Sequence, residues 1–381
     1  MGLASYLIIF IILNSSRSNS TPNNNIDPIK FSGKYEVISY AKFKNSKISF
    51  KVKEWSNEEK IILIKVENFK ANYFDVGDVL NIKGELKLTD LKNDYFFSQH
   101  IQGVINNPEI KIDRKGNGPL TYLSRFHYKI LSEINKNYHG QVADLLSGLL
   151  IGVDTEFSDD LEESFKITNT NHIIAVSGFN LNLLAEFLTI FLVVLPRKKL
   201  SILIFLVLII FYCIVGFDNI PCLRALLMHG LRSCALFLGR RSSYLNIWGM
   251  GLFIIIMIDP ALVFSISLKL SFLATLGLIF LESIYNKLDL VIENWVLSSA
   301  LVTFFCSIGI LPVSIYLGSG LTIKGILANV LVVPIIPLVM VSGIISVIFS
   351  MLKMPFLILI IRFTDALLQL LLLIIDASAK L

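Results

Sequence analysis

The chain has 381 residues, which is enough for two domains. Apolar residues make up 54% of it and charged residues 17%, and the mean hydropathy is +0.68. That composition is too apolar for an ordinary soluble protein. The formal net charge is +5 and is unevenly spread. Between Lys30 and Lys115, sixteen Lys and Arg face twelve Asp and Glu, whereas charges are sparse after Pro196.

The first 28 residues predict a short hydrophobic segment and a linker. Leu3 to Leu13 is apolar for eleven residues, short of the roughly twenty that cross a bilayer. Residues 14–27 are rich in Ser, Asn and Pro, which is typical of a linker.

Residues 29–115 predict an all-β domain that lies outside the membrane bundle. Tyr35–Tyr40 and Ile48–Val52 alternate apolar and polar residues, and Ile61–Val66 is a continuous apolar run. Gly77-Asp78 then forms a turn into Val79–Gly84. Several short strands with regular turns, and the pattern V-G-D-x-L-x-I-K-G, favour a small barrel of the OB type.

Basic and aromatic residues alternate in the first half of this domain. Lysines neutralise phosphates and aromatic rings stack on bases, which suits single-stranded nucleic acid. The same pattern also fits a solvated basic sheet with core aromatics. The candidate nucleic-acid-binding residues are Lys34, Lys42, Lys44, Lys51, Lys53, Tyr40 and Phe43.

Residues 116–170 predict amphipathic, interfacial helices, and residues 171–381 a polytopic transmembrane bundle. Leu123, Phe126, Ile130 and Ile134 are spaced to share one helix face. The expected fold is therefore a membrane α-helical bundle of about eight spanning helices with an N-terminal external OB-like domain. The eight candidates are Phe179–Leu195, Leu200–Val215, Pro221–Leu238, Leu245–Ile258, Ala261–Leu281, Val291–Leu317, Ile326–Ser350 and Pro355–Ile375.

Basic residues in the connections predict the orientation of the bundle. Arg197–Lys199, Arg240-Arg241, Lys287 and Lys353 follow every second helix, and Lys324 is the exception. Basic loops lie on the cytoplasmic side. The predicted location is the cytoplasmic membrane, with the OB-like domain outside.

The polar stretch His172–Leu184, here named the seam motif, lies where the soluble part meets the apolar part. Its sequence H-I-I-A-V-S-G-F-N resembles the signature of the ComEC family of competence membrane proteins. Three more stretches agree in order: Leu223–Ala225, Leu270–Gly277 and Gly325–Pro334. The resemblance implies a channel core that takes up single-stranded DNA across the cytoplasmic membrane in natural transformation.

Polar residues inside the apolar part are candidates for lining a translocation pathway. Charges in spanning helices are costly and usually face a bundle interior or water, although snorkelling to the membrane surface or structural burial explains such residues equally. Asn329 and Pro334 are expected to let the seventh helix bend. Lys269 stands where family members usually have Gln, and is expected to contact phosphate or pair with an acid such as Asp259. The candidate pathway residues are His172, Ser177, Gly178, Asn180, Asn182, Arg224, Arg232, Lys269, Ser271 and Asn329.

Motifs for catalysis are missing from the sequence. No zinc-ligand spacing, P-loop, nucleophile elbow or H-x-H-x-D-H pattern occurs. We therefore expect no enzyme activity, metal or cofactor, and no metallo-β-lactamase-like domain of the kind that longer family members carry. The expected partners are single-stranded DNA and membrane lipid, with a separate motor and nuclease. The alternatives are a transporter of another anionic or lipid-linked substrate, or a non-transporting membrane scaffold.

Overall fold

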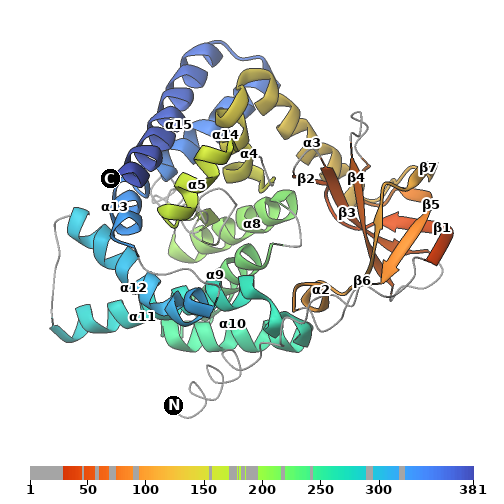
Figure 1. The fold of residues 1–381 in the computed structure, drawn as a ribbon. Coiled ribbons are helices and arrows are strands. Elements are labelled where there is room, and N and C mark those ends of the chain that lie inside the picture. The colour runs from red at the N-terminus through yellow and green to blue at the C-terminus, as the bar shows by residue number, and fades with distance from the viewer. Residues whose placement is uncertain are drawn as a thin grey trace.

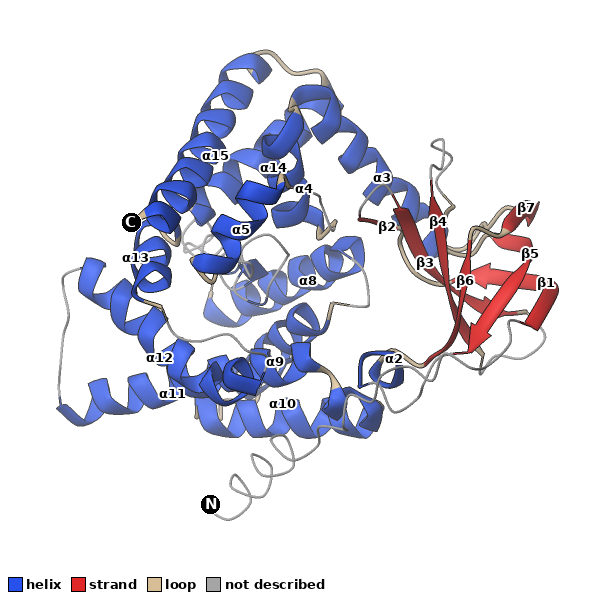
Figure 2. Cartoon of the chain, in the orientation of Figure 1, coloured by secondary structure: helices blue, strands red, loops and turns tan. Residues whose placement is uncertain are grey.

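A computed structural model places the strands at one end of the molecule and the helices over the rest (Figures 1 and 2). It describes residues 29–44, 47–55, 60–67, 74–88, 94–153, 157–170, 178, 180–181, 185, 196–215, 219–240, 243–288, 295–316 and 322–381.

The strands form a small closed barrel. The sheet order is β1-β3-β4-β6-β5-β7, and an additional β1–β5 pairing closes it. β4 and β6 run parallel, whereas the other pairs are antiparallel. This order is that of an OB-like barrel, which confirms the predicted fold of the N-terminal region. The strands are β1 (Ile29–Val37), β2 (Lys42–Lys44), β3 (Lys47–Glu54), β4 (Ile61–Glu67), β5 (Val79–Leu88), β6 (Ile101–Asn106) and β7 (Glu109–Arg114).

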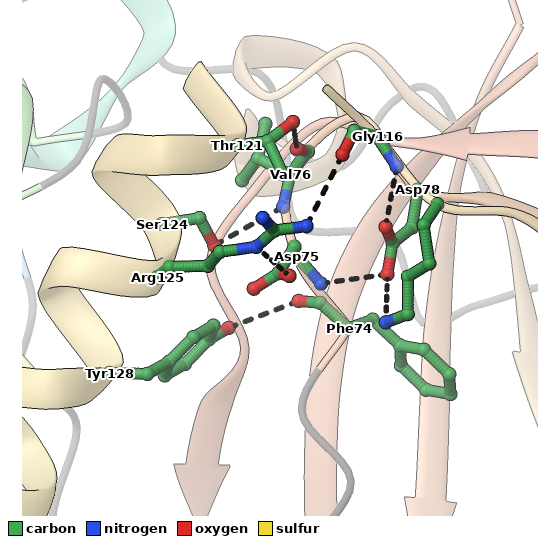
Figure 3. Close-up of polar contacts among 10 residues, drawn as sticks. Phe74, Asp75, Val76, Asp78, Gly116, Thr121, Ser124, Arg125 and Tyr128 are labelled. Atoms are coloured by element: carbon green, nitrogen blue, oxygen red, sulfur yellow. Dashed lines mark hydrogen bonds and ion pairs between the residues drawn. The ribbon is translucent and has the colours of Figure 1, made fainter. Parts of the chain in front are cut away.

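The barrel core consists of the aliphatic and aromatic residues that alternate along these strands. Tyr35, Phe50 and Ile64 are almost fully buried there. The turn before β5 depends on Gly77, whose φ of +92° is in the region that glycine adopts without strain. Asp78 beside it is completely buried, and its carboxylate accepts from the backbone of Asp75 and Gly116 and from Lys115 (Figure 3).

The remaining elements are helical. They are α2 (Asp94–Ser98), α3 (Pro119–Asn137), α4 (Gly140–Ile151), α5 (Asp159–Ile167), α8 (Arg197–Val215), α9 (Ile220–Phe237), α10 (Tyr244–Ile258), the 3-10 helix η1 (Pro260–Phe264), α11 (Ile266–Leu288), α12 (Trp295–Tyr316), α13 (Ile323–Val332), α14 (Ile336–Leu352) and α15 (Leu357–Lys380).

Three described helices are long and apolar enough to cross a membrane, or four if the bent pair α13 and α14 counts as one span. They contain Ile220–Phe237, Ile266–Tyr285 and Leu357–Lys380. The protein is thus a multi-pass membrane protein, and the predicted count of eight is not confirmed. The first predicted helix, Phe179–Leu195, lies almost entirely outside the described residues. The predicted start of the fifth at Ala261 is wrong, because Pro260–Phe264 forms a separate 3-10 turn.

The seventh predicted helix is bent, as expected. α13 and α14 meet at 45° across a short break. Pro334 lies in that break and has no N–H to continue the helical bonds. Asn329, in the last turns of α13, is buried and donates back to the carbonyl of Gly325 at 2.9 Å.

The barrel is joined to the helices through α3. Phe126 is 43% exposed, whereas Thr121, Ser124 and Tyr128 are buried. The first half of α3 buries hydroxyl groups because they meet barrel backbone that must be hydrogen-bonded, whereas Ile134 in its second half is buried in the helical core. Val76 donates to Ser124 Oγ at 3.2 Å, and Thr121 Oγ1 donates to the Val76 carbonyl at 2.7 Å (Figure 3).

A second joint connects the barrel to the bundle through the short helix α2. His100 Nε2 lies 2.8 Å from Asp259 Oδ2, at the start of η1. The rings of Phe97 and Phe264 meet edge to face at 5.2 Å. Two separate joints, through α2 and α3, therefore set the position of the barrel over the helices.

Candidate functional site

The most unusual side chain in the helical part is Arg224 on α9. It is 7% exposed, although it lies in a helix that is apolar and long enough to span a membrane. Asn219 starts this helix, since its side chain accepts from the backbone of Cys222, and Pro221 occupies the first turn. Arg224 therefore lies in the second turn, close to the helix start.

Two hydroxyls from α11 hold the Arg224 guanidinium. Nε donates to Ser271 Oγ at 2.7 Å, and Nη1 donates to Thr275 Oγ1 at 2.6 Å. Ser271 and Thr275 are four residues apart and so share one helix face. The ring of Phe272 lies 6.0 Å from the guanidinium carbon, within cation–π range.

Gly178 of the seam motif lies directly against the same guanidinium. A Cβ at this position would overlap Arg224 Nη2 and would lie 2.8 Å from the Pro221 carbonyl oxygen. Only a residue without a side chain fits that space. We name Arg224, Gly178, Ser271 and Thr275 the Arg224 cluster, which joins the seam motif, α9 and α11.

The Arg224 cluster holds a positive charge with neutral neighbours. No described carboxylate lies within ion-pair distance of Arg224. A buried charge without a counter-ion is costly, and hydroxyls only partly offset the loss of water. Nη1 also donates to Met228 Sδ at 3.4 Å, whereas Nη2 makes no hydrogen bond to any described residue.

Asn180 connects the seam motif to a different element. Its side chain is 2% exposed and donates from Nδ2 to the Leu149 carbonyl of α4 at 3.4 Å. Gly178 and Asn180, two residues apart, therefore contact α9 and α4 respectively. His172, Ser177 and Asn182 lie outside the described residues.

Lys269 does not join the Arg224 cluster. It is 5% exposed and lies at the start of α11, within electrostatic range of Asp94 on α2. Asp259, the acid proposed as its partner, instead contacts His100. Lys269 therefore lies beside the barrel joint.

The other predicted pathway residues separate as well. Arg232 is exposed, and its guanidinium lies 5.1 Å from the centroid of the Tyr244 ring. Asn329 is buried on α13, and its Oδ1 has no hydrogen-bond partner among the described residues. Of the predicted pathway residues, the fold therefore brings Gly178, Arg224 and Ser271 together. It leaves Arg232, Lys269 and Asn329 apart from them.

The predicted nucleic-acid-binding residues of the barrel also differ in their exposure and in their partners. Lys34 is exposed and pairs with Asp113 at 2.8 Å, Lys42 is exposed on β2, and Lys51 donates to Gln99 at 2.6 Å. Lys53 is half-buried on β3. The side chains of Phe43 and Lys44 lie outside the described set.

Tyr40 belongs to the barrel joint. Its ring stacks on His127 of α3 at 4.3 Å. His127 is itself buried, and its Nδ1 lies 2.8 Å from the Ile214 carbonyl of α8. Burial lowers the pKa of His127, and the hydrogen bond to Ile214 opposes that shift.

Sequence reasoning missed two residues of interest. Thr275 was overlooked although it follows Ser271 by four positions, the spacing that places both on one helix face. Trp55 was overlooked although it directly follows the basic strand β3. Trp55 is 50% exposed, and the Arg114 guanidinium lies 5.3 Å from its ring centroid.

A family model described as "Competence protein" matches residues 149–381. The chain belongs to that family. The match begins in α4 and includes every member of the Arg224 cluster. No curated protein and no solved structure matches the chain.

The Arg224 cluster has the chemistry of an anion-binding site. Among the described residues, no group of three or more His, Cys, Asp or Glu could hold a metal ion. A guanidinium is a group that recognises phosphate in proteins, and Nη2 of Arg224 has no hydrogen-bond partner among the described residues.

Proposed function

We propose that this protein takes part in DNA uptake during competence, and that it conducts single-stranded DNA across the cytoplasmic membrane. Membership of the competence family supports the role in uptake. The conducting role is supported mainly by one observation: Arg224 is buried in a candidate spanning helix with neutral hydroxyl partners.

In this proposal Arg224 binds each DNA phosphate transiently. A passing phosphate supplies the negative charge that the described part of the cluster does not provide. Ser271 and Thr275 hold the guanidinium in place when no phosphate is present. Because their oxygens are neutral, they do not compete with the phosphate as a carboxylate would. Weak, exchangeable contacts of this kind let a polymer move through a channel.

The barrel gathers the strand before it enters. Trp55 supplies an exposed aromatic face, with Arg114 and Lys34 nearby. Base stacking on such a face tolerates any sequence. Lys42 on β2 adds an exposed positive charge. We place the barrel outside the cell on the distribution of basic loops.

Residues 29–115 collect DNA, 116–170 connect, and 171–381 conduct, while residues 1–28 have no assigned role. His172, Ser177 and Asn182 are proposed to line the entrance together with Gly178 and Asn180. A separate motor is proposed to pull the DNA strand, and a separate nuclease to degrade the complementary strand.

Replacing Arg224 tests the conducting role. Labelled-DNA uptake should fall strongly in Arg224→Ala, because a lost charge-assisted hydrogen bond costs about 1.5–3 kcal/mol, or roughly 10- to 150-fold. Arg224→Lys should retain part of the uptake, since it keeps the charge and loses the bidentate geometry.

The matched control is Arg232→Ala, which removes an exposed arginine from the same helix. Uptake close to that of the parent is expected. If Arg224→Ala took up DNA at the parent rate while folding normally, the proposal would be wrong. Transport of another anionic substrate, or a scaffolding role, would then explain the bundle better.

A further inference from the structure

The outer face of α15 carries polar and charged residues in a helix long enough to cross the membrane. Arg362, Asp365 and Gln369 lie within about 60° of each other at 3.6 residues per turn. We name these three the α15 stripe. Arg362 and Gln369 are exposed and Asp365 is half-exposed. α15 runs along the edge of the helical part (Figure 1).

The stripe lies opposite the buried residues of α15, and of its members Asp365 is within electrostatic range of Tyr138. α15 packs on α14, α13, α5 and α4, and its buried residues include Thr364, Leu368 and Leu371. Asp365 and Gln369 are bonded to each other at 2.7 Å. Arg362 makes no ion pair with any described residue.

The position of the stripe along the helix makes it costly in lipid. At 1.5 Å per residue, Asp365 and Gln369 lie about 12 and 18 Å from the helix start at Leu357. Charges at such depths seldom face lipid, and they usually pair with one another inside a protein. Snorkelling can relieve Arg362, which is near the end, but an Asp side chain is too short to reach the surface from there.

The stripe lies in a longer pattern of exposed residues spaced three and four apart. Ile358 precedes it and Leu373 follows it, and these are 70% and 65% exposed. This spacing is that of the contact positions in paired helices, where a polar residue specifies register.

We propose that α15 pairs with α15 of a second copy of this chain, in parallel, about a two-fold axis along the membrane normal. A two-fold interface uses the same patch on both copies, so that patch must complement itself. One turn separates the positive Arg362 from the negative Asp365 on the same face. Each arginine can therefore reach Asp365 of the second copy, and the two Gln369 amides bond across the axis.

The pattern favours a second copy over an unrelated helix. Both charges of each ion pair are already present in one chain at matching depth, because two copies share one orientation in the membrane. The apolar residues at either end of the stripe, Ile358 and Leu373, would meet their own counterparts.

Cysteine cross-linking of the full chain in membranes tests the pairing. Leu373→Cys should give a covalent dimer at several times the yield of Phe363→Cys. Both positions are exposed, but Phe363 lies about 100° away from Arg362 around the helix. The parent chain, with its four cysteines, sets the background.

Charge reversal provides the second arm. Arg362→Asp should weaken the dimer about 5- to 30-fold, the range for one polar contact between membrane helices. Adding Asp365→Arg to that variant should restore it. The proposal is overturned if Leu373→Cys cross-links no better than Phe363→Cys, if the product contains a different polypeptide, or if the double reversal fails to restore the dimer.

Discussion

At the scale of single residues, the decisive feature is the fit between Gly178 and Arg224. Gly178 has room for no side chain, because the guanidinium and the Pro221 carbonyl occupy the space. Gly178 of the seam motif therefore forms one wall of the site where the buried charge lies.

Gly178→Ala should reduce DNA uptake nearly as much as Arg224→Ala. The added methyl would displace the guanidinium from Ser271 and Thr275, or push the seam motif away from α9. The measurement is labelled-DNA uptake at matched protein levels.

Gly249→Ala is the control for that substitution. Gly249 lies inside α10, and a Cβ there would meet nothing within 4 Å. Alanine is also the better helix former by about 1 kcal/mol. Stability and uptake should therefore equal or exceed those of the parent. Equal uptake by both glycine variants would contradict the role of Gly178.

His127 predicts a pH dependence of stability. Burial lowers its pKa in the folded protein, so the unfolded chain binds the proton more readily. The contribution of His127 is therefore fully present above its unfolded pKa of about 6.5 and is lost as the pH falls below that value. Thermal unfolding in detergent at several pH values measures this.

His127→Gln should flatten that acid-side slope while retaining a donor for the Ile214 carbonyl. The exposed His139 is the control, and His139→Gln should leave the slope unchanged. An unaltered slope in His127→Gln would assign the pH dependence to other groups.

At the scale of elements, α3 connects the barrel to the bundle. One side of it hydrogen-bonds to the backbone of Val76, while its far end donates from Asn137 to Ser350 of α14 at 2.8 Å. The face toward the barrel is hydroxyl-rich. Apolar periodicity alone therefore does not identify it.

Ser124→Ala should loosen the joint between α3 and the barrel. It leaves the buried N–H of Val76 without its partner, and such a group costs about 1–3 kcal/mol. Limited proteolysis and thermal unfolding should both detect the loss. Ser132→Ala, at an exposed position of the same helix, should change neither; a stable Ser124→Ala joint would show that water replaces the lost bond.

At the scale of the whole molecule, the barrel and the Arg224 cluster would act in sequence on one strand. The barrel provides stacking and charge, and the bundle provides the buried Arg224 guanidinium. DNA binding through exposed lysines weakens as the salt concentration rises, whereas base stacking on an aromatic ring does not depend on salt in this way.

Binding of a fluorescent oligonucleotide to the full chain separates these contributions. Trp55→Ala should weaken binding by about 1–3 kcal/mol, or roughly 5- to 150-fold, without changing the salt slope. Lys42→Ala should lower the slope of log K against log salt by about 0.7, the value for one phosphate on a single strand. Tyr95→Ala is the control, since Tyr95 is an exposed aromatic (57%) on α2. Binding that is insensitive to both Trp55 and Lys42 would place the DNA elsewhere on the chain.

Local patterns determined much of this protein. Alternation and turn residues specify the barrel, because strand burial has a period of two. Apolar runs specify helices, and Pro334 specifies the bend, because proline lacks the N–H that continues a helix. The seam motif and the L-R-A stretch identify the competence family without any geometry.

Only the tertiary structure decided which polar residues act together. Gly178, Arg224 and Thr275 are far apart in the chain and meet through helix packing, which periodicity does not encode. Lys269 and Arg232 are basic residues in apolar helices, as Arg224 is, but they contact other residues. Composition therefore could not distinguish them from Arg224. Burial and hydrogen bonding depend on distant segments, and for that reason the partners of each charge followed from the fold.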